Sequence, residues 1–179
     1  MAEDIQYKLF LGRVPESKKF DRVHAVLVIK DGRVLLRYKN GEPRITGGRI
    51  DADEDLLVAL KREILEELNC EIDLCDYLGY IEATGDGVME NWARMVARVD
   101  KILPPKPDPD RTGNWIYGRV LAPRVVATEE MGKVPVFGEN NIKIVDEAYK
   151  VARENNYFTE LPSQEYETLN VESRDVRKD

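Results

Sequence analysis

The sequence predicts a single α/β domain. The chain has 179 residues, a length that one hydrophobic core commonly serves, and 42% of its residues are hydrophobic, close to the usual share in globular proteins. β-rich apolar runs and two stretches with helical periodicity occur along it. We expect the domain to span residues 1–162 and the polar residues 163–179 to form a mobile tail.

Strands are expected where β-rich apolar runs are bounded by turn residues. Asp31-Gly32 joins two of these runs into a hairpin, the pair Gly47-Gly48 marks a loop, and the proline-rich stretch 103–114 is a longer loop. The expected strands, in chain order, cover residues 5–11, 23–29, 33–38, 72–83, 90–99 and 115–121.

Two amphipathic helices are expected, over residues 54–68 and 141–155. Asp53 is the predicted N-cap of the first helix, and Asn69 is the predicted left-handed residue at its end. Apolar residues at three- and four-residue intervals give this helix one apolar face, formed by Leu57, Leu60, Ile64 and Leu68.

Nearly all of the acidity lies in one segment around the first helix. The formal net charge is −7, with 34 acidic and 27 basic side chains. Residues 51–67 contain seven acids and two bases, a net charge of −5, and residues 163–179 contribute −2. The remaining residues sum to zero, so the segment 51–67 is where we expect the chemistry.

The composition disfavours several classes of protein. No run of about 18 apolar residues exists, so no membrane-spanning segment is expected. An acidic chain makes nucleic acid an improbable partner. Cys70 and Cys75 are the only cysteines, too few for a disulfide framework, and the N-terminus lacks the pattern of a signal peptide. We therefore expect a cytoplasmic protein.

Three carboxylates of the acidic segment share one face of the first helix. Glu63, Glu66 and Glu67 are spaced i, i+3 and i+4, where like charges repel. A divalent cation between them would relieve that repulsion, and hard oxygen ligands favour Mg²⁺ or Mn²⁺. The bare pattern is also typical of solvated helix faces, so the spacing alone does not establish a metal site.

The complete run from Gly48 to Cys70 resembles the signature of the Nudix hydrolases. That signature places a glycine six residues before a glutamate, which is followed eight residues later by an arginine-glutamate pair and then by two further glutamates. Gly48, Glu54 and every later charged position agree with it. Asn69 and Cys70 replace the final glycine and aliphatic residue, and neither change removes a ligand.

The resemblance implies a fold and a reaction. The fold is an α/β/α sandwich with a mixed β-sheet, with helix 54–68 on one side and helix 141–155 on the other. The reaction is hydrolysis of the diphosphate linkage in a small nucleoside diphosphate derivative or nucleoside triphosphate. The implied cofactor is Mg²⁺, with Mn²⁺ as a substitute, and a homodimer is possible because dimers are frequent in the family.

The resemblance also assigns roles to residues of the motif. Glu63, Glu66 and Glu67 would hold the metal together with the backbone carbonyl of Gly48. Arg62 would orient a catalytic glutamate through a charge-assisted bond and would pair with Glu54. The implied catalytic set is therefore Arg62, Glu63, Glu66 and Glu67.

Residues outside the motif have competing interpretations. Arg44 and Arg49 are candidates for contact with substrate phosphates. Glu129 and Glu130 are candidates for a general base from a later loop, although a motif glutamate is an alternative and two solvated loop acids are another. Arg94 is a further candidate for contact with a phosphate or a terminal group. The other candidates, each weighed against ordinary packing or pairing, are His24 near the site, Glu90 as a base, and Trp92, Trp115, Tyr117 and Phe137 against a nucleobase.

Two other functions stay open at this point. The domain could bind a nucleotide as a sensor without hydrolysing it, although the intact carboxylate set argues against this. It could also act on RNA 5′ ends, but the sequence outside the acidic segment offers no obvious basic stripe.

Overall fold

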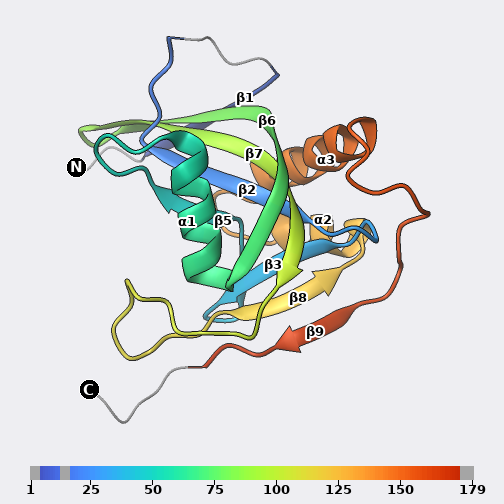
Figure 1. Cartoon of the computed structure of the whole chain (residues 1–179). Coiled ribbons are helices and arrows are strands. Elements are labelled where there is room, and N and C mark those ends of the chain that lie inside the picture. The colour runs from blue at the N-terminus through green and yellow to red at the C-terminus, as the bar shows by residue number, and fades with distance from the viewer. Residues whose placement is uncertain (1–4, 13–16, 174–179) are drawn as a thin grey trace.

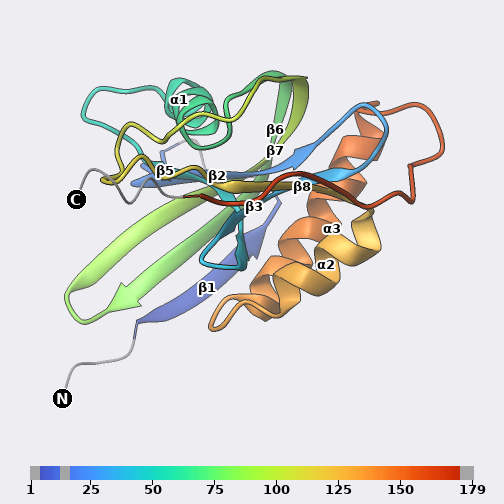
Figure 2. The same cartoon turned by 90° about the horizontal axis from the view of Figure 1, so that it is seen from below.

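A mixed β-sheet lies between two helical layers (Figures 1 and 2). The structure, a computed structural model, describes residues 5–12 and 17–173. Within these residues the sheet order is β1-β6-β7-β2-β3-β8-β9, with β4 paired to β3 and β5 paired to β2. Strands β2 and β7 run parallel and the other pairs are antiparallel. The strands are β1 (Gln6–Leu11), β2 (Arg22–Val28), β3 (Val34–Lys39), β4 (Glu42–Arg44), β5 (Thr46–Arg49), β6 (Cys70–Gly85), β7 (Val88–Ile102), β8 (Gly118–Ala122) and β9 (Glu167–Asn170).

Helices cover both faces of the sheet. In Figure 2, α1 (Leu56–Leu68) lies above the sheet, and α2 (Arg124–Gly132) and α3 (Gly138–Glu154) lie below it. Leu60 and Ile64 of the first helix pack into one core, and Ile144 and Val145 of the third pack into the other. The predicted α/β/α sandwich with a mixed sheet is confirmed.

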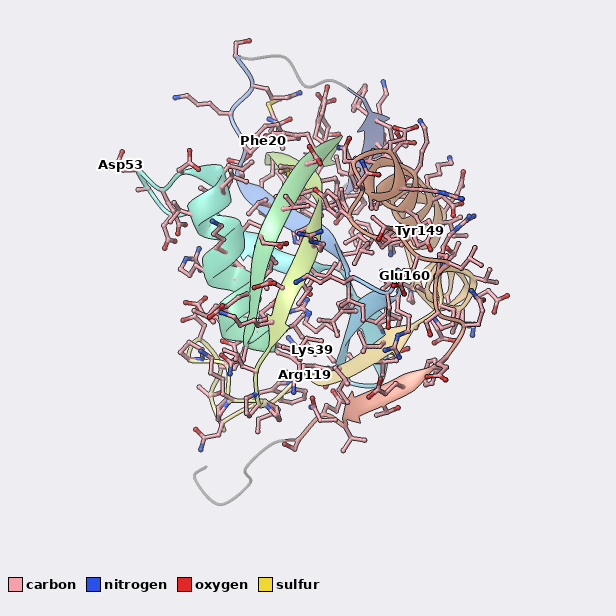
Figure 3. The ribbon with its side chains drawn as sticks, turned by 45° about the vertical axis from the view of Figure 1, so that its right-hand side comes forward. Phe20, Lys39, Asp53, Arg119, Tyr149 and Glu160 are labelled. Atoms are coloured by element: carbon pink, nitrogen blue, oxygen red, sulfur yellow. The ribbon has the colours of Figure 1, made fainter. Side chains whose placement is uncertain are left out.

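Helix α1 begins two residues later than the sequence suggests. The carboxylate of Asp55, not that of Asp53, accepts a hydrogen bond from the backbone N–H of Leu57 at 2.8 Å. Asp53 has φ 66° and lies in the loop before the helix (Figure 3), whereas an N-cap residue needs extended backbone. Asn69 has φ 51° and ψ 52°, so the predicted left-handed end of the helix is confirmed.

The glycine pair expected in a loop lies in a strand. Gly47 and Gly48 belong to β5 and pair with His24 and Val23 of β2. A Cβ atom on Gly47 would lie 2.1 Å from the carbonyl oxygen of Val23, so only glycine permits this approach. The glycines here allow close packing of strands, which local sequence patterns do not distinguish from a turn.

Helix α2 was not expected from the sequence. Val125 and Val126 are β-branched and lower the intrinsic helix propensity of this segment. Ala127 and Met131 are buried in the core beneath the sheet, so tertiary packing stabilises the helix.

Part of the expected mobile tail is a strand, which corrects that prediction. Strand β9 pairs with β8, and Ser173 forms a further bridge with Ile116. Asn170 accepts a hydrogen bond from the buried Arg119 at 2.5 Å and donates one to the carbonyl of Tyr117 at 2.8 Å. These partners are distant in sequence, which is why composition alone missed them. Residues 174–179 of the expected tail lie outside the described residues.

No helix in the described ranges is long and apolar enough to cross a membrane.

Replacing Asp55 by alanine should lower the free energy of unfolding by about 1 kcal/mol, because the N–H of Leu57 loses its acceptor. Asp55→Asn should retain most of the stability, since asparagine is an equally good N-cap. Asp53→Asn is the matched control and should have little effect. Urea unfolding followed by circular dichroism measures all three, and equal losses in Asp55→Ala and Asp53→Asn would contradict the assigned cap.

Removing the side chain of Asn170 should destabilise the protein by about 1–3 kcal/mol, because Arg119 and the carbonyl of Tyr117 each lose a hydrogen-bond partner. Thr168→Ala changes an exposed residue of the same strand and serves as the control. Thermal and urea unfolding measure the difference. An Asn170→Ala protein as stable as the control would show that β9 does not contribute to the fold.

Candidate active site

The candidate site lies where strands β2 and β3 separate. The two strands pair only at Leu27–Leu35 and Val28–Val34. Beyond this point β2 pairs with β5 and β3 pairs with β4, so the sheet forks. A cleft of about 600 Å³ is lined by residues of both branches of this fork, of α1, and of the loop 103–117.

The cleft is lined by more basic than acidic side chains. This is the reverse of the charge of the acidic segment, because the basic residues come from other parts of the chain. The acidic lining residues are Glu63, Glu67, Asp108 and Asp110. The basic lining residues are Arg22, Arg37, Lys39, Arg44, Arg49 and Arg111.

Glu63 lies directly against Gly48. A Cβ atom on Gly48 would lie 2.3 Å from Oε1 of Glu63, so a side chain at this position would displace the Glu63 carboxylate from β5. Burial raises the pKa of Glu63, and its hydrogen bond with Arg62 opposes that effect. The structure thus brings together Glu63 and Gly48, the residues expected to supply a carboxylate and a backbone carbonyl to the metal.

Glu67 is buried and tied to two strands. It is 7% exposed, forms an ion pair with Arg37 of β3, and accepts a hydrogen bond from the backbone N–H of Gly47 at 3.1 Å. A buried carboxylate needs such compensation, because its desolvation is otherwise costly. Glu67 therefore links α1 to both branches of the fork.

Arg62 organises the remaining carboxylates of the motif. Its guanidinium donates two hydrogen bonds to Glu54, at 2.9 and 3.0 Å, which is the expected pairing. It also donates to Glu63 at 3.0 Å, to Glu66 at 3.1 Å, and to the carbonyl of Arg49 at 3.0 Å. The bond from Arg62 lowers the pKa of Glu54. One planar cation thereby fixes the positions of three carboxylates.

The donor types of the site fit a divalent cation, but their present arrangement does not enclose one. Three carboxylates and a backbone carbonyl are the hard oxygen ligands that Mg²⁺ prefers. Within the described residues, no three His, Cys, Asp or Glu side chains are grouped to hold a metal ion. The carboxylates face guanidinium groups instead, Glu67 that of Arg37 and Glu63 that of Arg62. A bound metal would replace some of these contacts.

The predicted residues outside the motif divide into two groups. Arg44 and Arg49 line the cleft, and Arg49 pairs with Glu90 at 3.2 Å. Glu129 and Glu130 do not lie in a loop, as expected, but on α2, and neither lines the cleft. Glu130 instead accepts a hydrogen bond from the hydroxyl of Tyr38 at 3.3 Å.

Glu90 does not line the cleft but pairs with Arg22 and Arg49, which do. It accepts hydrogen bonds from Arg22 at 2.9 Å and from Trp92 Nε1 at 2.7 Å. The bond from Arg22 lowers the pKa of Glu90, which makes it a poor general base.

His24 lines the cleft and contacts a buried arginine. Its Nδ1 lies 2.6 Å from Nη1 of Arg94, which is 5% exposed. Burial lowers the pKa of His24 well below its usual value, so the ring is neutral and Nδ1 accepts the hydrogen bond from the guanidinium. His24 is half-buried and belongs to neither core, and it makes a polar contact at the wall of the cleft.

The aromatic candidates do not reach the cleft. Trp92 and Phe137 pack with Tyr7, with ring centroids 5.4 and 4.5 Å from that of Tyr7, and Tyr117 is buried. Neither these residues nor Trp115 lines the cleft.

Sequence reasoning missed several residues of the cleft wall. Arg37 and Lys39 alternate on an otherwise apolar strand, and this alternation was the available signal. Asp108, Asp110 and Arg111 lie in the proline-rich loop, and no sequence pattern there indicated that their side chains line the cleft.

The comparisons with known proteins agree with this geometry. A family model, the NUDIX domain, matches residues 18–135. A search of curated proteins found no match. The fold is similar to that of the Bacillus subtilis pyrophosphohydrolase BsRppH, with a TM-score of 0.63, 17% identity, and coverage of 85% of this chain and 98% of that one.

Two further solved structures are similar. A MutT from work on Aliivibrio salmonicida and Vibrio cholerae has a TM-score of 0.52 and 16% identity, over 75% of this chain and 99% of that one. An ADP compounds hydrolase has a TM-score of 0.56 and 14% identity, over 88% of this chain and 97% of that one. These likenesses support the fold alone. Family membership rests on the family model, which covers more than half of the chain. The chain belongs to the Nudix family of hydrolases.

Proposed function

We propose that this protein is a divalent-metal-dependent pyrophosphohydrolase that cleaves the diphosphate linkage of a small nucleotide. The observation that carries the proposal is the convergence of Glu63, Glu67 and Gly48 at a cleft with a basic wall. Carboxylates suit the metal, and the surrounding cations suit the phosphates of the substrate. Mg²⁺ is the proposed ion, with Mn²⁺ as a substitute.

Each part of the site contributes to the proposed reaction. Bound Mg²⁺ would neutralise phosphate oxygens and lower the pKa of the attacking water. Glu63, Glu66 and Glu67 would hold the ion with the carbonyl of Gly48. Arg62 would keep Glu63 and Glu66 in place, and Glu67 is held by Arg37 and the N–H of Gly47. Positioning of this kind, together with electrostatic stabilisation, supplies most of the catalysis in phosphoryl chemistry.

A motif glutamate is the best candidate for the general base. Glu63 and Glu67 line the cleft, whereas Glu129 and Glu130 do not. A general base must lie within hydrogen-bond reach of the proton that it takes, directly or through one water. The geometry therefore favours the carboxylates of α1 over those of α2.

The direct test is a hydrolysis assay with Mg²⁺ and with Mn²⁺. The substrates are nucleoside triphosphates, sugar nucleotides, ADP-ribose and dinucleoside polyphosphates. Release of phosphate or pyrophosphate from at least one class, abolished by EDTA, is the expected result. Tight nucleotide binding without turnover of any substrate would instead support the sensor function.

Glu67→Gln should abolish most turnover, because it removes a negative charge from the proposed metal site. The loss should exceed the roughly 10–100-fold that follows removal of an outer partner of a metal ligand. The fold should survive at reduced stability, since the amide oxygen can still accept the N–H of Gly47 while the buried Arg37 loses the charge of its partner. Glu71→Gln, on the exposed part of β6, is the control. Near wild-type Mg²⁺-dependent activity in Glu67→Gln would contradict the proposed role of Glu67 as a metal ligand.

Arg62→Lys should lower kcat about 10–100-fold, since an ammonium group cannot reproduce the paired bonds to Glu54 together with the bonds to Glu63 and Glu66. Calorimetric titration with Mn²⁺ should show weakened metal binding in the same variant. Lys61→Arg, at a neighbouring position outside this network, is the control and should retain activity and Mn²⁺ binding. Unchanged Mn²⁺ affinity in Arg62→Lys would show that the arginine does not position the ligands.

A further inference from the structure

We infer that Glu172 is a positioning residue for the cleft, and that residues 167–173, which we name the clasp, hold two of its walls in place. One wall is the turn between β3 and β4, and the other is the loop 103–117. Residues of both walls line the cleft. This inference goes beyond the proposed function, and only its kinetic test rests on that function.

The turn between β3 and β4 presents two backbone N–H groups that the pairing of these strands does not use. Lys39 pairs with Glu42, so Asn40 and Gly41 form a two-residue turn. Their φ values are 54° and 74°, as in the type I′ turns that an Asn-Gly pair favours. Successive N–H groups in a turn form a small concave site that suits an anion.

The carboxylate of Glu172 occupies this concave site. Its Oε2 accepts a hydrogen bond from the N–H of Asn40 at 2.7 Å, and its Oε1 accepts one from the N–H of Gly41 at 2.8 Å. Bonds to an ionised carboxylate are stronger than those between neutral groups. Because each oxygen holds one N–H, the carboxylate fixes both the position and the orientation of the turn. Lys39 and Asn40 line the cleft and Glu172 does not, so Glu172 acts on this wall from outside.

The clasp also holds the loop that forms the other wall. The backbones of Ser173 and Ile116 exchange hydrogen bonds of 2.7 and 2.9 Å. The side chain of Asn170 donates to the carbonyl of Tyr117 at 2.8 Å. The hydroxyl of Tyr117 donates in turn to Asp108, a lining residue of the cleft, at 3.0 Å. The clasp is therefore linked to lining residues of both walls.

Strand pairing and a glycine bring Glu172 to the turn. Strand β9 runs along β8 at the edge of the sheet (Figure 1). A Cβ atom on Gly118 would lie 3.1 Å from Cβ of Tyr38 and 3.2 Å from the backbone nitrogen of Glu172, so the glycine leaves room for the chain after β9. At the other end of the clasp, Glu167 pairs with Arg33 at 3.0 Å. Contacts at both ends favour a fixed clasp over a loosely attached tail.

Loss of the Glu172 carboxylate should loosen the turn rather than unfold the protein. The pairing of β3 with β4 remains, but the two N–H groups lose their shared acceptor. A substrate that contacts this wall would then have to order the turn on binding, which costs free energy. The carboxylates of α1 are held by other contacts, so the chemical step should change little. A positioning role therefore predicts a higher KM with a nearly unchanged kcat.

The first test is residue-resolved hydrogen exchange of the full chain, measured by NMR. In Glu172→Ala the amides of Asn40 and Gly41 should exchange at least about tenfold faster, as expected from the loss of a charged acceptor. The amide of Glu42, which does not donate to Glu172, should also exchange faster because the turn loosens as a unit. Glu165→Ala, which removes an exposed acid just before the clasp, is the control and should change none of these rates.

The second test is steady-state kinetics with Mg²⁺ on whichever substrate of the panel has the highest kcat/KM. Glu172→Ala should raise KM at least about threefold and leave kcat within about twofold of the unaltered protein. Glu172→Gln keeps one acceptor oxygen and should recover part of the affinity. Glu165→Ala should leave both constants unchanged.

The two tests separate this inference from the proposed function. Circular dichroism establishes that the variants are folded, and Glu172→Gln should show the exchange effects at smaller size. Unchanged exchange at Glu42 in Glu172→Ala would overturn the inference, and so would faster exchange with an unchanged KM. Faster exchange at Asn40, Gly41 and Glu42 without turnover of any substrate would support the clasp and contradict the proposed function alone. Turnover with the three exchange rates unchanged would contradict this inference alone.

Discussion

The close approach of α1 to β5 and β2 is the constraint on which the site depends. Gly47 permits β5 to lie against the backbone of β2, and Gly48 permits Glu63 to lie against β5. A side chain at Gly47 would push β5 away from β2, and a side chain at Gly48 would displace the carboxylate of Glu63. Either change would alter how the carboxylates of α1 face the fork between β2 and β3. Two residues without side chains therefore determine where the charged side chains act.

Much of this local arrangement could be predicted from the sequence. The helix, its left-handed end at Asn69, and the pairing of Arg62 with Glu54 follow from spacing within one continuous segment. The fold class followed from the same motif. What could be predicted was therefore short-range, because helical periodicity and capping depend on neighbouring residues.

The rest depends on contacts between distant parts of the chain. Strand β9 forms because it pairs with the free edge of β8. Helix α2 forms because its apolar residues pack against the core, although the segment has weak helix propensity. The basic wall of the cleft is of the same kind. Arg37 and Arg111 are 74 positions apart in the printed sequence, yet both line one cleft. Net charge along the sequence therefore located the acids of the site but not the cations that face them.

The ion pair of Arg37 and Glu67 connects these two charge sets. Both side chains are buried, and removing the partner of a buried charge typically costs about 3–5 kcal/mol. A metal that takes Glu67 away from Arg37 would meet that penalty unless an anion replaces the carboxylate. A substrate phosphate at Arg37 would offset it, so metal and substrate should each favour the binding of the other, as linkage requires. On this argument the pair stabilises the cleft while it is empty and couples its two ligands when it is filled.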